Sequence, residues 1–174
     1  MDSNSELEKI IEKIAKSLTQ KKSGKIRKAE YKTKIVGPES PHGIYVYDKS
    51  SNEWVLVRKD GDAFEPWKDG YYVIYFDNTM CPACRIYDLS WYVFVETIGK
   101  RLENTEFVII LCRWFSRDCE SEAASKSFKK YGVIASPTTL LLKRENGKIV
   151  KEEKIRGVKK LDELIKIVTE FTRS

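Results

Sequence analysis

Apolar positions with helical spacing open the chain, and strand-like apolar runs follow further along. Ser5 and Glu8 match a capping box, which marks a helix start. Five apolar residues recur at helical spacing behind it: Leu7, Ile10, Ile11, Ile14 and Leu18. The pattern predicts an amphipathic helix whose apolar stripe packs against the main domain. A partner-binding or membrane-surface helix is the alternative.

A loop rich in glycine and proline spans residues 37–43. Apolar runs at residues 44–47 and 54–57 follow it and predict a β-hairpin. His42, the only histidine, lies in the loop without a nearby carboxylate pattern, so we expect a surface residue with no catalytic role.

From residue 70 onward, strand and helix patterns alternate. Asn146-Gly147 supplies the positive φ angles of a tight hairpin turn. We expect buried strands at 71–76 and 107–112, helices at 82 to about 102, 121–131 and 158–171, and hairpin strands at 138–142 and 148–155. This order predicts an α/β fold, a mixed central sheet with helices on both faces. The helix and hairpin of residues 1–65 form an N-terminal extension to a domain of residues 66–174.

Composition narrows the class of protein. The chain has 32 basic and 26 acidic residues. Its densest basic block spans residues 21–28 and is interpreted as a solvated connecting segment. A binding patch for nucleic acid or for an acidic partner is the alternative. Neither a membrane-spanning run nor a secretory signal is evident, so we expect a soluble cytoplasmic protein. A single glutamine among abundant lysine, glutamate and isoleucine favours a hyperthermophilic source.

The sequence Cys81-Pro82-Ala83-Cys84 joins a predicted buried strand to a predicted helix. That context places the first sulfur at a helix N-terminus, where unpaired N–H groups and the helix dipole stabilise a thiolate. Pro82 suits the first helical position, because its missing N–H costs nothing there. Cys81 is therefore the predicted nucleophile, and Cys84, one turn into the helix, resolves the mixed disulfide.

Residues 70–174 resemble the thioredoxin family in element order and at several separated motifs. The stretch at residues 131–142 is similar to the family segment that carries a cis-proline, which maps to Pro137 preceded by Ser136. Asn146-Gly147 falls at the family's hairpin turn, and Gly157 matches a glycine that borders the substrate groove. The resemblance implies a thioredoxin-like fold, with a groove formed by Pro82, Ala83, Ser136, Pro137 and Gly157.

Several positions depart from the family pattern. The family's buried acid falls at Tyr75, so its role is vacant or filled by another group or water. Met80 replaces a tryptophan before the motif, Asp77 stands four residues before the first cysteine, and Leu89 replaces a kinking proline. These departures leave the rate and the redox potential open.

The resemblance implies a protein thiol–disulfide oxidoreductase that needs no bound cofactor. Its partners would be proteins with disulfides or thiols and a thioredoxin-reductase-like protein, with neither nucleic acid nor membrane among them. Pro82 resembles glutaredoxin-like and isomerase-like centres, so we expect a less reducing pair than in thioredoxins. The alternative is a scaffold protein of the same fold whose cysteines are structural or redox-sensing.

Cys112 and Cys119 form a second candidate pair. Cys112 ends the strand beside the active-site strand, so both sulfurs could lie near Cys81. A structural disulfide closing the intervening loop is the favoured interpretation, and a relay that exchanges with the first pair is the alternative. Four-cysteine zinc binding is disfavoured, because six residues separate Cys112 from Cys119 and the usual ligand spacing is two to four.

Overall fold

The computed structural model describes residues 5–14 and 30–173. The chain forms two compact units, Met1–Tyr31 and Lys32–Ser174. Within the first unit, residues 5–14 are helical, as predicted. Leu18 and the basic block 21–28 lie outside the described residues, and the packing of the apolar stripe stays a prediction. No helix in the described ranges is long and apolar enough to cross a bilayer.

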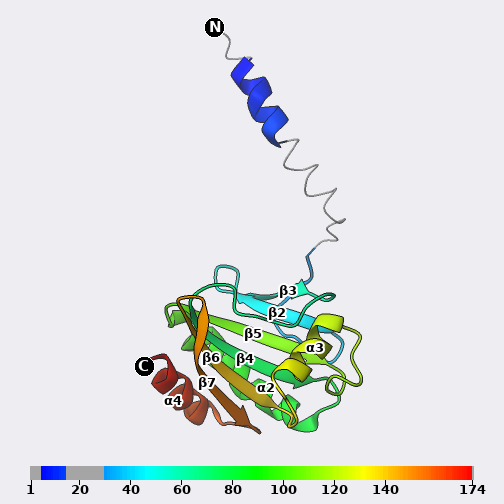
Figure 1. Cartoon of the computed structure of the whole chain (residues 1–174), viewed down its shortest axis with the longest axis vertical. Coiled ribbons are helices and arrows are strands. Elements are labelled where there is room, and N and C mark those ends of the chain that lie inside the picture. Colours follow the sequence, from blue (N-terminus) through cyan, green and yellow to red (C-terminus); the bar gives the residue numbers. More distant parts are fainter. Residues whose placement is uncertain (1–4, 15–29, 174) are drawn as a thin grey trace. The chain divides into compact units, whose positions relative to one another are not determined.

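The second unit is built on one sheet of seven strands (Figure 1). The strands are β1 (Lys32–Thr33), β2 (Gly43–Asp48), β3 (Glu53–Arg58), β4 (Gly70–Asn78), β5 (Thr105–Cys112), β6 (Thr138–Glu145) and β7 (Lys148–Arg156). Their order across the sheet is β1-β3-β2-β5-β4-β6-β7. β4 and β5 pair in parallel, and the remaining pairs are antiparallel. β4 therefore runs inside the sheet, where both of its faces are covered.

Helices cover both faces of the sheet, which confirms the predicted α/β architecture (Figure 1). The helices are α2 (Pro82–Thr97), α3 (Glu122–Lys130) and α4 (Leu161–Thr172), with a short 3₁₀ turn, η1 (Gly99–Arg101), after α2. α2 and α4 pack on one face and α3 on the other. α2 ends at Thr97, before residue 102, where the sequence pattern places its end. Gly99 follows the helix and lies so close to the Phe107 ring that an added Cβ would come within 2.8 Å of it.

Aromatic side chains fill the layer between α2 and the sheet. The Trp91 ring lies 5.3 Å from that of Tyr75, 6.0 Å from that of Trp54 and 6.3 Å from that of Phe107. All four side chains are fully buried. Large aromatic rings each remove about 150–250 Å² from water, so this cluster fixes α2 firmly against β4.

The β6–β7 hairpin turns at Asn146-Gly147, as predicted. Both residues have positive φ, 52° and 77°, which is the conformation that favours this pair in tight turns. Their backbone N–H groups donate to the Asp69 carboxylate at 2.8 and 3.1 Å. The carboxylate thus holds the turn from outside the hairpin.

The predicted N-terminal hairpin is β2–β3, and it extends the central sheet. β2 pairs antiparallel with β5, and β3 continues outward to β1, a two-residue edge strand that the sequence pattern did not indicate. Residues 32–65 therefore lie in the same compact unit as the segment that follows them. The division into an extension of residues 1–65 and a domain of residues 66–174 stays a prediction.

Candidate active site

Cys81 is the N-cap of α2, at the junction that the sequence predicts. Its Sγ accepts the backbone N–H of Cys84 at 3.0 Å, and Pro82 occupies the start of the helix. No acidic residue lies in the first turn of α2. Both cysteines are free thiols. The Cys81 sulfur thus faces the backbone N–H groups at the start of α2.

Cys84 is fully buried, while Cys81 keeps 4% of its surface exposed. The Cys84 Sγ lies 3.0 Å from the Ser136 Oγ. Burial raises the pKa of the Cys84 thiol strongly, and the nearby Asp77 charge raises the pKa further. Hydrogen bonding to Ser136 acts in the opposite direction and lowers it. Cys84 is thus a buried thiol that keeps its proton at neutral pH.

Ser136, which precedes Pro137, comes to Cys84 from a distant part of the chain. The Ser136–Pro137 peptide bond is cis, as the resemblance implied. Gly157 has a φ of 88° and donates its N–H to the Pro137 carbonyl at 2.8 Å. Pro82 is exposed and Ala83 is half-buried. The structure therefore brings Ser136 against Cys84 and Gly157 against Pro137.

Tyr75, which stands where the resemblance expects an acid, is buried beside the cysteines. Its hydroxyl donates to the Asp88 Oδ1 at 2.9 Å and lies 3.1 Å from the Cys84 carbonyl oxygen. Burial raises the pKa of Tyr75 well above its usual range. The phenol therefore stays protonated and acts as a donor, and it supplies no carboxylate.

A buried carboxylate is nevertheless present at Asp77, two residues further along β4. Residues two apart on a strand share a face, so Asp77 lies on the same side of the sheet as Tyr75. Its side chain has no exposed surface, and its Oδ1 pairs with the Arg85 Nη2 at 2.7 Å. Arg85 also pairs with Asp88, at 3.0 Å. Among the described residues, the Asp77 Oδ2 has no hydrogen-bond partner.

Burial and the Asp88 charge raise the pKa of Asp77 from 3.8 to about 7. The Arg85 charge and hydrogen bonding to the Cys84 thiol and the Tyr75 hydroxyl act in the opposite direction and lower the pKa of Asp77. A carboxyl group that titrates near neutral pH can both accept and return a proton. By the resemblance alone, Asp77 is a departure from the family pattern. Its position two residues after Tyr75 on the same strand face is the sequence signal that identifies it as a candidate for the family's buried acid.

Solved structures share this arrangement of strands and helices. A thioredoxin from Aeropyrum pernix has a TM-score of 0.50 and 16% identity, over 77% of this chain and 98% of that one. The chain has a thioredoxin-like fold. A Trichomonas vaginalis thioredoxin (TM-score 0.43, 17% identity, 59% of this chain and 79% of that one) and StoA from Bacillus subtilis (TM-score 0.43, 17% identity, 59% and 85%) are also similar. No family model and no curated protein sequence matches the chain.

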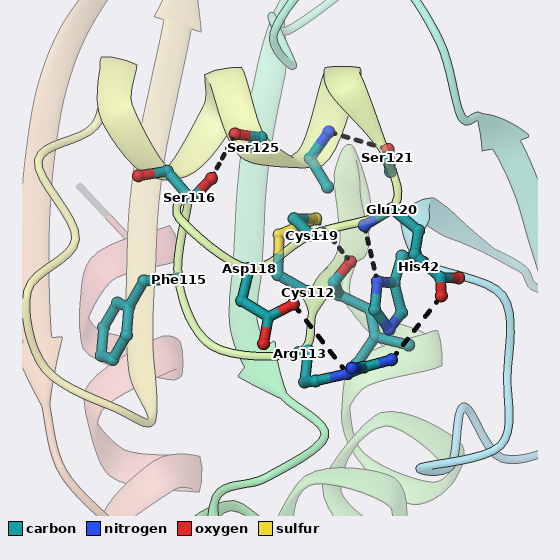
Figure 2. Close-up of a disulfide and its surroundings, with 12 residues drawn as sticks. His42, Cys112, Arg113, Phe115, Ser116, Asp118, Cys119, Glu120, Ser121 and Ser125 are labelled. Carbon is teal, nitrogen blue, oxygen red and sulfur yellow. Dashed lines mark hydrogen bonds and ion pairs between the residues drawn. A yellow bond between two sulfur atoms is a disulfide. The ribbon is translucent and has the colours of Figure 1, made fainter.

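A second cysteine pair accompanies the thioredoxin-like fold of this chain. Cys112 and Cys119 are joined as a disulfide, with 4.6 Å between their Cα atoms (Figure 2). Cys112 is the last residue of β5, and its carbonyl accepts the Thr79 N–H at 2.9 Å. The disulfide loop, residues 112–119, therefore meets the segment that leads into Cys81.

His42 is buried, so the expectation of a surface residue is wrong. Only 5% of its surface is exposed, and its Nδ1 accepts the Glu120 N–H at 3.0 Å (Figure 2). Burial lowers the pKa of His42, and the Arg113 charge also lowers it, although Glu120 and Asp118 oppose this. The neutral His42 ring therefore contacts Glu120, next to Cys119. The sequence could not indicate this contact, because Glu120 lies 78 residues away from His42.

An open hollow lies beside the active-site segment. It has a volume of about 440 Å³ and is lined by Met80, Trp114, Arg117 and Asp118. Met80 and Trp114 are 65% and 41% exposed, although both carry large apolar side chains. The residue before Cys81 and the disulfide loop thus present apolar surface together.

The arrangement of the cysteines bears on the zinc alternative. In the described part of the chain, no group of three or more His, Cys, Asp or Glu side chains is arranged to hold a metal ion. Cys112 and Cys119 are joined to each other, and Cys81 and Cys84 lie at the start of a helix. A four-cysteine site would require all four sulfurs to face one centre.

Proposed function

We propose that the protein is a thiol–disulfide oxidoreductase that exchanges disulfides with partner proteins through Cys81 and Cys84. The observation that carries the proposal is the N-cap geometry, in which the Cys81 sulfur accepts the Cys84 N–H while a second free thiol lies one turn behind it. A sulfur at this position is stabilised as a thiolate by the helix N-terminus. The buried acid beside Cys84 adds the means to ionise the second thiol.

In the first step, the Cys81 thiolate attacks one sulfur of a substrate disulfide. A Cys81–substrate S–S bond forms, the substrate S–S bond breaks, and the leaving sulfur departs as a thiolate that takes a proton from water. The small exposed fraction of Cys81 favours disulfides in extended, accessible segments over those buried in folded proteins.

In the second step, Cys84 attacks the Cys81 sulfur. Asp77 titrates near neutral pH, and its Oδ2 has no hydrogen-bond partner in the described part of the chain, so its ionised form accepts the Cys84 proton as the thiol becomes nucleophilic. The Cys81–Cys84 disulfide forms and the substrate leaves with its second thiol. Two electrons have passed from the protein to the substrate disulfide, and reversal of both steps oxidises a substrate dithiol.

Substrate positioning falls to the segments around the cysteines. The proposed groove comprises Pro82, Ala83, Ser136, Pro137 and Gly157. Support comes from the contacts of Ser136 with Cys84 and of Gly157 with Pro137. The hollow beside Met80 and Trp114 suits an apolar substrate side chain next to the reacting cysteine.

The proposed setting is the cytosol of a hyperthermophile, with a thioredoxin-reductase-like protein recycling the dithiol. Support comes from the composition and from the Cys112–Cys119 disulfide, since intracellular disulfides occur in such organisms.

The test is reduction of insulin disulfides by dithiothreitol, comparing the wild-type protein with Cys81→Ser. We expect Cys81→Ser to fall to the uncatalysed rate. Cys84→Ser is the matched variant, because it should form a stable mixed disulfide with a substrate. Equal rates for wild type and Cys81→Ser, with no trapped species for Cys84→Ser, would support the scaffold alternative instead.

A further inference from the structure

Asn78, the last residue of β4, connects the two cysteine pairs. Its side chain is completely buried. The Oδ1 accepts the Phe115 N–H at 2.7 Å, and the Nδ2 donates to the Ser136 Oγ at 2.8 Å. Its backbone carbonyl accepts the Cys81 N–H at 3.2 Å. A buried amide is costly unless its groups are paired, and here both ends of the side chain are engaged.

The Asn78 bonds favour one direction of the Ser136 hydroxyl proton, because they occupy one of the two acceptor sites of its oxygen. A backbone N–H can only donate, so the amide oxygen must face Phe115 and the amide nitrogen must face Ser136. A hydroxyl has a single proton. Because the Ser136 oxygen receives the Asn78 N–H, its own proton is free to be donated to the Cys84 sulfur, 3.0 Å away. This donation stabilises the Cys84 thiolate.

The other end of the connection lies inside the disulfide loop (Figure 2). Phe115 has a φ of 56°, a left-handed conformation that a bulky residue rarely adopts. Several bonds hold the loop in shape, including the Arg113 and Trp114 N–H groups, both donating to the Asp118 carbonyl at 3.0 Å. The Cys112–Cys119 bond closes the same segment. Phe115 can direct its N–H at Asn78 only while this conformation is held.

We propose that the Cys112–Cys119 disulfide, acting through Phe115 and Asn78, sets the hydrogen bond that Ser136 donates to Cys84. Asn78 is thus a positioning residue, and the second disulfide tunes the exchange at the first pair without exchanging disulfides with it. The proposal rests on the oxidoreductase function proposed above. A dithiol that opens the second disulfide gives it two electrons and two protons and becomes a disulfide itself, leaving Cys112 and Cys119 as thiols. Opening the bond frees the loop and weakens the donation to Cys84.

The test isolates the step that Cys84 performs. The protein with Cys81 and Cys84 reduced and Cys112–Cys119 intact is mixed with dithionitrobenzoate, which forms a mixed disulfide at Cys81. Attack by Cys84 then releases a second thionitrobenzoate in a first-order phase. The comparison covers wild type, Asn78→Ala, Ser136→Ala and the double variant Cys112→Ala/Cys119→Ala. Ser125→Ala is the matched control, because it removes the 2.7 Å bond to the Ser116 carbonyl in the same loop and leaves Asn78 untouched.

A hydrogen bond to a charged sulfur shifts its pKa by about one unit. A rise of one unit leaves about tenfold less thiolate and makes that thiolate about threefold more nucleophilic, so the second phase should slow about threefold. We expect this slowing in Asn78→Ala, Ser136→Ala and the cysteine double variant. Adding Asn78→Ala to the double variant should slow it no further, because both changes break the same connection. Ser125→Ala and the first phase should keep wild-type rates.

Two results would overturn the proposal. The first is a second phase at the wild-type rate in the cysteine double variant; if that variant is also impaired in multiple-turnover insulin reduction, disulfide exchange between the two cysteine pairs is indicated instead. The second is slowing that multiplies when Asn78→Ala is added to the double variant. Failure of the proposed function would differ from both, because the wild-type protein itself would then release no second thionitrobenzoate. Melting temperatures identify any variant that fails to fold. If Asn78→Ala fails to fold, Ser136→Ala still tests the hydrogen bond to Cys84.

Discussion

Replacing Asp77 by asparagine tests whether this buried carboxyl group accepts the Cys84 proton. The substitution keeps the size of the side chain and removes its charge. General acid–base catalysis contributes about 10²–10⁴-fold to a rate. The lower end of this range applies, because Asp77→Asn also removes a charge that raises the pKa of Cys84, and this change offsets part of the lost rate. We expect the thionitrobenzoate release by Cys84 to slow about 100-fold at pH 8.

The pH profile is the sharper signature of Asp77. In the wild-type protein, the rate of release should rise through an inflection near pH 7, where Asp77 loses its proton. Asp77→Asn should lose that inflection. Asp88→Asn is the matched control, since the Asp88 charge raises the pKa of Asp77. It should keep the inflection and move it to lower pH.

Stability gives an independent measure of the same group. The pKa of Asp77 is raised from 3.8 to about 7 on folding, so its contribution to stability is full below pH 3.8 and is lost as the pH rises through 7. Each pKa unit corresponds to about 1.4 kcal/mol, so the two units between pH 5 and pH 7 correspond to about 3 kcal/mol. The unfolding free energy of Asp77→Asn, relative to wild type, should increase by about this amount between pH 5 and pH 8. An inflection retained in Asp77→Asn, together with a pH-independent stability difference, would refute the role of Asp77.

Three further predictions concern the potential, the histidine and the disulfide. The Cys81–Cys84 pair, equilibrated with glutathione, should have a potential less reducing than the value of about −270 mV for thioredoxin; an equal or lower value would contradict the assignment from Pro82. Burial lowers the pKa of His42, so its contribution to stability is full above its unfolded pKa of 6.5 and is lost as the pH falls through the folded pKa. The difference in unfolding free energy between wild type and His42→Asn should therefore shrink between pH 7.5 and pH 5.5. The charged groups that face His42, which are Glu120, Asp118, Arg113 and Lys59, are kept unchanged in this comparison. Cys112→Ala/Cys119→Ala should lose about 2.5 kcal/mol of stability, the chain-entropy value for a sequence separation of 7, which calorimetry would detect as a fall in melting temperature of about 8 °C. An unchanged melting temperature would show that the loop is held by its other bonds.

Short-range rules predicted the parts of the site that depend on neighbouring residues. Cys81 caps α2 because a strand ends and a proline-started helix begins at that point. The Asn146-Gly147 turn follows from the positive φ that these two residues tolerate. The fold class followed from the order of elements. The cap and the turn are each decided by neighbouring residues, and the fold class follows from the order in which such local patterns succeed one another along the chain.

The features that the sequence did not reveal depend on distant parts of the chain. Asp77 titrates near pH 7 because helices and strands enclose it and bring Asp88 close. His42 is buried because a segment 78 residues later donates to its ring. Asn78 carries no sequence signal, since its partners, Phe115 and Ser136, lie 37 and 58 residues away. Charge and burial at such positions are properties of the packed fold.

The last two residues of β4, Asp77 and Asn78, have consequences for how the protein can change. Consecutive strand residues face opposite sides of a sheet, so a single insertion or deletion in β4 would exchange the two side chains and disable both sets of contacts at once. The dipeptide between Cys81 and Cys84 lies outside the sheet and is free of this constraint. Pro82 and Ala83 can therefore be substituted while the register of β4, and with it the contacts of Asp77 and Asn78, stays intact.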